Sequence, residues 1–148
     1  MNKKTLKFVG YCLAVSAPLS LNHSLAQTDS SIWDGVFTEA QATRGETAYS
    51  ANCASCHSTD LRGNSNTPSL LGMSFMFIWE NQSLAELYTK MRNEMPSDNP
   101  GSLSTQTYED LLAFLLRSNQ FPAGEQALKA DTAKLTKISI TPKPVFSQ

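Results

Sequence analysis

The chain contains a single C-x-x-C-H run, formed by Cys53, Cys56 and His57. Two thiols at this spacing can each add to a vinyl group of one porphyrin, and the adjacent imidazole then lies beneath the iron as its fifth ligand. The run therefore predicts covalent attachment of one haem c through Cys53 and Cys56. This feature constrains the fold more than any other, because much of the hydrophobic core would then consist of the porphyrin.

Three other interpretations of the two cysteines are a redox dithiol, half of a zinc site and a structural disulfide. A zinc site needs two more ligands, and the remaining cysteine and histidine are Cys12 and His23, both near the N-terminus. A thioredoxin-like dithiol needs a βαβ context, which the residues after His57 do not provide. The adjacent histidine favours haem over all three.

Residues 1–26 have the features of an export signal. Three lysines precede an apolar stretch from Phe8 to Leu21, and Ser24-Leu25-Ala26 resembles a cleavage site. We therefore expect a signal peptide that is cleaved after Ala26 and a periplasmic protein. The apolar stretch is shorter than the roughly 20 residues that span a bilayer. Retention of the segment as a membrane anchor is the alternative.

Cleavage after Ala26 would leave 122 residues, enough for one domain with a modest core. The formal charge would change from −1 to −4, because three lysines and no acidic residue are lost. Haem propionates would add further negative charge. The balance disfavours nucleic acid and membrane insertion of the cleaved protein, and it favours a partner with a basic face.

Local patterns predict an all-α fold. Thr38 and Gln41 form a capping-box pattern, which begins a helix from Glu39 to the Cys53 region. Ser83 and Ser104 are expected N-caps. Further helices are predicted over residues 71–79, 84–94 and 105–118, with a polar loop over 60–69. Residues 27–37 are expected to form a flexible lead-in and residues 125–148 a mobile C-terminal extension.

These features together resemble a class I c-type cytochrome over about residues 38–124. In that family a glycine and an aromatic residue of the first helix cross a leucine and an aromatic residue of the last, which Gly45, Tyr49, Leu111 and Phe114 match. The resemblance implies a cytochrome c fold of about four to five helices around one covalently bound haem. It also implies single-electron transfer without catalysis.

The resemblance extends to the segment after the motif. In the family the carbonyl of a proline accepts a hydrogen bond from the iron-ligating histidine, and an apolar residue follows. Pro68 and Leu70 match these two positions. Trp79 matches a tryptophan that donates to a haem propionate in some members, although a core role is the alternative. Ser58 and Gln120 depart from the pattern, since glycine is common at both positions.

Met95 is the expected sixth ligand of the iron. Met95 and Pro96 lie where a helix must open into a loop, and the family presents its methionine thioether from such a Met-Pro step. Met91, four residues earlier, is the reserve candidate. Met73 and Met76 are expected to pack against the edge of the porphyrin. A Met/His pair fills both axial positions and raises the reduction potential relative to two histidines.

The stretch from Met95 through Gly124 is similar to cytochromes associated with pyrroloquinoline-quinone-dependent alcohol dehydrogenases. This similarity implies a dehydrogenase as electron donor and an oxidase or another cytochrome as acceptor. Two other functions are considered. One is a dedicated haem subunit of a dehydrogenase complex, and the other is a ligand sensor or peroxidase with a labile methionine ligand.

Overall fold

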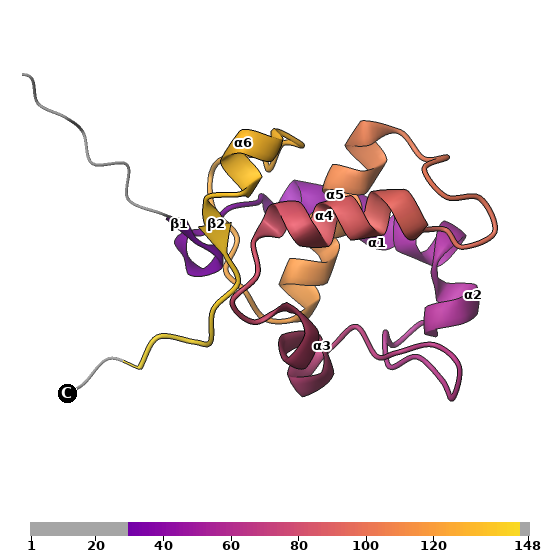
Figure 1. Ribbon diagram of the computed structural model, residues 1–148. Helices are drawn as coiled ribbons and strands as arrows, with labels where there is room; N and C mark the ends of the chain where they lie inside the picture. Colours follow the sequence, from indigo (N-terminus) through magenta and orange to yellow (C-terminus); the bar gives the residue numbers. More distant parts are fainter. Residues whose placement is uncertain (1–29, 146–148) are drawn as a thin grey trace, which may run out of the picture.

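The computed structural model describes residues 30–145, which are mostly helical (Figure 1). The longer helices are α1 (Glu39–Asn52), α3 (Gly72–Trp79), α4 (Leu84–Glu94) and α5 (Thr105–Ser118); α2 (Ala54–His57) and α6 (Thr132–Leu135) are single turns. A 3-10 turn, η1 (Ile32–Asp34), and the paired parallel strands β1 (Ser30–Ser31) and β2 (Ile138–Ser139) complete the elements. The predicted all-α fold is confirmed.

The expected signal peptide and its cleavage after Ala26 lie outside the described residues. Within residues 30–145, no helix is both long and apolar enough to cross a membrane.

The helix starts follow the capping residues of the sequence. Thr38 and Gln41 form a reciprocal capping box at the start of α1, and Ser83 and Glu86 form another at the start of α4. The Ser104 side chain accepts a hydrogen bond from the Thr107 amide at the start of α5. Each cap satisfies backbone donors that the first turn of a helix leaves without partners. The predicted starts of these three helices are therefore confirmed.

Helices α1 and α5 cross where α1 carries a glycine. A Cβ atom on Gly45 would lie 1.9 Å from the Asp110 carbonyl oxygen and 2.8 Å from Cβ of Phe114, so the two backbones can meet here only without a side chain. One turn further along α1, the rings of Tyr49 and Phe114 pack with centroids 5.2 Å apart. The crossing expected between the first and last helices of the domain is confirmed.

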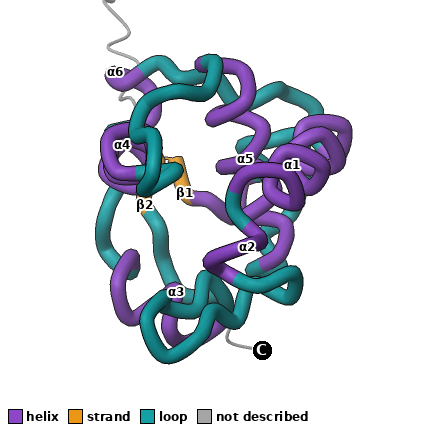
Figure 2. The backbone as a smooth tube through the Cα atoms, turned by 90° about the vertical axis from the view of Figure 1, so that its right-hand side faces the viewer, coloured by secondary structure: helices purple, strands orange, loops and turns teal. Residues whose placement is uncertain are grey.

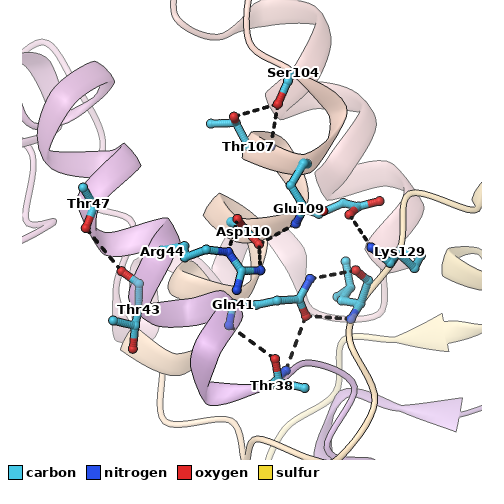
Figure 3. Close-up of polar contacts among 12 residues, drawn as sticks. Thr38, Gln41, Thr43, Arg44, Thr47, Ser104, Thr107, Glu109, Asp110 and Lys129 are labelled. Atoms are coloured by element: carbon cyan, nitrogen blue, oxygen red, sulfur yellow. Dashed lines mark hydrogen bonds and ion pairs between the residues drawn. The ribbon is translucent and has the colours of Figure 1, made fainter.

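An ion pair between Arg44 and Asp110 also links α1 and α5 at this crossing (Figure 3). Arg44 of α1 donates from Nε and Nη2 to the two carboxylate oxygens of Asp110, at 2.8 and 2.7 Å. Gln106 donates to the same carboxylate. The paired geometry raises the pKa of the Arg44 guanidinium through the hydrogen bond with Asp110. The buried acid at the crossing therefore has its partners within the scaffold.

The expectations of a flexible lead-in and a mobile tail are wrong for the described residues. Ile32 and Phe37 of the lead-in are fully buried, and so is Ile140 of the tail. Strands β1 and β2 join the two segments, and the Gly124 amide donates to the Phe37 carbonyl at 2.7 Å. The apolar residues of the two segments are too thinly spaced to form a helical pattern, but they cover the core together.

Side chains of α1 and α5 hold the tail (Figure 3). The amide of Gln41 donates to the Leu128 carbonyl at 2.8 Å and accepts from the Leu128 amide at 2.7 Å. The carboxylate of Glu109 accepts from the Ala130 amide at 2.7 Å and pairs with Lys129. Gln41 and Glu109 are both buried, so the tail satisfies polar groups that would otherwise be costly.

Candidate haem-binding site

The two cysteines of the C-x-x-C-H run flank a break between two helices. Cys53 ends α1 with φ −127° and ψ −34°, and α2 begins at the next residue, so the thiols lie about one turn apart. Cys53 is half-buried, Cys56 is exposed, and both thiols are free. A disulfide between them is therefore absent from the structure. Burial raises the pKa of the Cys53 thiol to about 11, and the neighbouring Cys56 adds to the shift.

His57 is the last residue of α2 and is 92% buried, with 8% of its surface exposed. Its Nδ1 atom lies 3.4 Å from the carbonyl oxygen of Pro68, the contact that the sequence led us to expect. The loop between them is closed by the Gly63 amide, which donates to the His57 carbonyl at 2.9 Å. A carbonyl at Nδ1 directs the ring proton to that atom and leaves Nε2 as the lone-pair nitrogen.

A tyrosine of the scaffold fixes the residue after the motif. The buried hydroxyl of Tyr49 donates to the Ser58 carbonyl at 2.7 Å, and the Ser58 hydroxyl donates to the Gly63 carbonyl at 2.9 Å. Burial raises the pKa of Tyr49 to about 12, so its hydroxyl remains a donor across the neutral range. Ser58 has φ +66°, a left-handed conformation that favours glycine. The departure from glycine at this position is therefore accommodated by specific hydrogen bonds.

Met95 follows the last residue of α4 and has extended backbone angles, φ −126° and ψ 148°. Its carbonyl oxygen accepts from the Tyr108 hydroxyl at 2.6 Å, and its amide donates to the Met91 carbonyl at 3.0 Å. Figure 2 shows α4 on one side of the molecule and α2 on the other, with α3 between them at the bottom of the view.

Comparison with known families decides what kind of domain this is. Residues 40–115 match the family model described as "Cytochrome C oxidase, cbb3-type, subunit III", which covers half of the chain. The chain belongs to this family of cytochrome c domains. Membership implies haem c and haem-based electron transfer.

A search of curated proteins finds no match. Among solved structures, this cytochrome c domain resembles a chain of the sulfane dehydrogenase SoxCD from Paracoccus pantotrophus, with a TM-score of 0.50 and 21% identity. The alignment covers 73% of this chain and 61% of that chain. At this identity the likeness supports the fold alone.

The side chains of the C-x-x-C-H run fit a covalently bound haem. Cys53 and Cys56 are free and one turn apart, and the His57 ring is held at one nitrogen only. Within residues 30–145, no cluster of three or more His, Cys, Asp or Glu side chains could hold a metal ion. The described part of the chain therefore offers no support for the zinc interpretation of the two cysteines.

The methionines of the cytochrome c domain differ in exposure. Met73 is 90% exposed on α3, and Met76 on the same helix is half-buried. The expectation that both pack against the edge of the porphyrin stays a prediction. Phe75 and Trp79 form the buried face of α3, and Met73 lies on the opposite face. Met91 is half-buried against the core.

Leu70 and Trp79, the other two candidate haem contacts predicted from the sequence, both lie against the core. Leu70 is half-buried against the core, and its amide donates to the Leu61 carbonyl at 2.8 Å. Trp79 is buried and lines a cavity of about 840 Å³ between the end of α3, the outer face of α4 and β2. Within residues 30–145, the indole N–H of Trp79 donates no hydrogen bond to protein.

Two tyrosines that the sequence did not single out as site residues matter for the geometry. Tyr108 is fully buried and holds the Met95 carbonyl, a role that no local pattern signals because the two residues are 13 positions apart. Tyr88 of α4 is also buried, but its hydroxyl has no hydrogen-bond partner among the described residues. The Tyr108 hydroxyl therefore has an acceptor in the protein, and the Tyr88 hydroxyl has none among residues 30–145.

Proposed function

We propose that this chain is an exported monohaem electron carrier whose haem is bound by Cys53 and Cys56 and ligated by His57 and Met95. The observation that carries the proposal is the geometry of the motif, in which free thiols adjoin a histidine already oriented through its Nδ1 contact with Pro68. Met95 directly follows α4, and the Tyr108 hydroxyl holds its carbonyl oxygen at 2.6 Å.

The residues have separate tasks in this proposal. His57 offers Nε2 to the iron because Pro68 holds the opposite ring nitrogen. Tyr108 fixes the backbone of Met95, so the thioether can be presented from a defined position. With His57 and Met95 both bound to the iron, a haem held here would have no open position for oxygen or peroxide. The haem supplies reversible one-electron chemistry, and the protein around it supplies attachment, ligands and a dry environment.

Export supports the proposal in chemical terms. Residues 1–26 have the pattern of a signal peptide, and haem is attached to reduced C-x-x-C-H motifs after translocation. We infer a periplasmic location for the mature chain. Trp79 and Leu70 would contact the haem, Trp79 through its indole N–H to a propionate.

The proposed donor is a quinoprotein or another periplasmic dehydrogenase, and the proposed acceptor is an oxidase or another cytochrome. The support is the similarity of residues 95–124 to cytochromes associated with pyrroloquinoline-quinone-dependent alcohol dehydrogenases. A dedicated subunit of such a dehydrogenase is the second form of the same function. Copurification with the dehydrogenase, together with loss of dehydrogenase-to-acceptor electron flow on deletion of the gene, would favour the dedicated subunit over a general carrier.

Mass spectrometry of protein matured in a periplasm with haem-attachment machinery tests the proposal. We expect the mass of the chain without residues 1–26 plus one haem, and this haem should stay attached after denaturation. A separate redox titration should follow a one-electron curve. An unmodified mass with two titratable thiols would contradict the proposal and return Cys53 and Cys56 to thiol chemistry.

A further inference from the structure

The loop between α2 and α3 is anchored at both ends by the two crossing helices. At its start, the Tyr49 hydroxyl of α1 donates to the Ser58 carbonyl. At its end, the side chain of Asn119, the C-cap residue of α5, contacts the backbone of Leu70 and Gly72. The second anchor joins residues that lie 49 and 47 positions apart in the sequence, so no local pattern signals it.

Both donor hydrogens and the oxygen of the Asn119 amide have partners. Its Nδ2 atom donates to the Leu70 carbonyl and to the Leu115 carbonyl, both at 2.9 Å. Its Oδ1 atom accepts from the Gly72 amide at 2.8 Å. A side-chain amide has two hydrogens to donate and one oxygen that accepts, so this group is fully used. It ties the last turn of α5 to the segment before α3.

The segment that Asn119 holds carries the carbonyl that contacts His57. Pro68 lies two residues before Leu70, and its carbonyl oxygen is 3.4 Å from Nδ1 of His57. The opposite side of this turn is backbone of the same loop, because a Cβ atom on Gly63 would lie 2.7 Å from the Pro68 carbonyl oxygen. Contacts inside the loop therefore fix its shape, whereas the contact with Asn119 fixes its position relative to α5.

We propose that Asn119 is a positioning residue of the haem site, which holds the Pro68 carbonyl at His57 and thereby lowers the reduction potential of the haem. The proposal rests on the proposed function, since it requires that Nε2 of His57 binds the iron. A carbonyl held at Nδ1 raises the basicity of the imidazole, and a more basic ligand stabilises ferric iron relative to ferrous iron. Loss of the Asn119 contacts should therefore raise the reduction potential.

The sign of this change separates positioning from a general contribution to stability. A variant that only loosens the fold admits water to the haem. Water stabilises the more highly charged ferric state, so the reduction potential falls. A variant that weakens the contact at Nδ1 of His57 raises the potential instead, because the iron loses electron donation from its ligand.

A spectroelectrochemical titration of the mature, haem-loaded protein tests the proposal. We expect Asn119→Ala to have a higher reduction potential than the wild type and to retain the low-spin visible bands. Asn119 has φ −91° and ψ 13°, angles that alanine also adopts, so the substitution adds no backbone strain. The matched control is Asn66→Ala, which removes an exposed amide from the same loop and should leave the potential unchanged.

A second variant separates the contacts of Asn119 with the loop from its contact with α5. The hydroxyl of Asn119→Ser can donate to the Leu115 carbonyl, four residues earlier, but is too short to reach Leu70 or Gly72. This variant should raise the potential as Asn119→Ala does, with a smaller loss in the free energy of unfolding. In both variants the Gly72 amide, which donates to Asn119 in the wild type, should exchange faster with solvent.

Failure of this proposal and failure of the proposed function give different results. A wild type without covalent haem overturns the proposed function, and the positioning role with it. A haem-loaded Asn119→Ser variant whose potential is unchanged or lower overturns the positioning role alone, whether or not Asn119→Ala folds.

Discussion

The crossing of α1 and α5 and the haem-binding segment are held together in different ways. At the crossing the backbones themselves meet at Gly45, aromatic rings pack alongside, and the buried carboxylate of Asp110 has its partners. The segment from Cys53 to Leu71 has one single-turn helix, two free thiols and left-handed backbone at Ser58 and Leu61. Individual hydrogen bonds hold this segment, as the contacts of Tyr49 and Pro68 show.

The difference indicates that the crossing provides stability and that the haem-binding segment provides the haem contacts. Close packing makes the crossing intolerant of added atoms, whereas the haem-binding segment depends on a few polar contacts that can be removed one at a time. Substitutions at the crossing should therefore act on the free energy of unfolding, and substitutions in the segment should act on haem attachment and ligation.

The largest effect is expected at the thiols. Cys53→Ser/Cys56→Ser should abolish covalent haem attachment completely, because no thioether can form, and haem staining after denaturing electrophoresis measures this. The matched control is Ser55→Ala, between the two cysteines, which should retain full staining. Retention of haem by the double variant after denaturation would contradict the attachment proposed here.

Gly45→Ala should lower the free energy of unfolding, because it acts on the crossing of α1 and α5. Its Cβ atom would lie 1.9 Å from the Asp110 carbonyl oxygen, so the helices must separate, at a cost of about 3 kcal/mol or more. Chemical denaturation followed by circular dichroism measures the loss. Ser50→Ala, at an exposed position of the same helix, should change the free energy of unfolding by less than about 0.5 kcal/mol.

Tyr108→Phe should weaken the ligation by Met95 while leaving the crossing intact. Removal of the hydroxyl takes away the 2.6 Å hydrogen bond to the Met95 carbonyl, a loss of about 1–3 kcal/mol. The ferric iron–thioether band in the visible spectrum should disappear at a lower temperature than in the wild type. Ser50→Ala, at an exposed position of α1, is the control and should leave the temperature at which the band disappears unchanged.

The smallest effect is expected at Gln120, which has φ +66° after the end of α5. Gln120→Gly should raise the free energy of unfolding by about 1 kcal/mol, because glycine adopts this conformation without steric cost. Gln120→Ala keeps the Cβ atom and should not stabilise the protein. Equal stabilisation by both variants would show that backbone strain at this position is not the cause.

The sequence predicted the features that depend on neighbouring residues. Thr38, Ser83 and Ser104 mark helix starts within one turn of the residues they cap, and these starts are found in the structure. The contact of His57 with Pro68 was expected from the family pattern and is present. The glycine at the crossing was also recognised from that pattern, and the structure supplies its physical reason.

The features that depend on distant residues were not predicted. The tail has no local pattern, since its attachment relies on Gln41 and Glu109, far away in the sequence. Strands β1 and β2 are two residues long, too short for any alternation to be visible. The exposure of Met73 depends on which side of α3 meets the core, which Phe75 and Trp79 decide together.

The measurement that tests the central claim most directly is the visible spectrum of the protein, oxidised and reduced, after maturation in a periplasm. The account predicts sharp low-spin bands in the reduced form and the weak long-wavelength band of a ferric iron–thioether bond, which Met95→Ala should remove. A high-spin spectrum in the wild type, or a thioether band that survives Met95→Ala, would contradict the ligation by His57 and Met95.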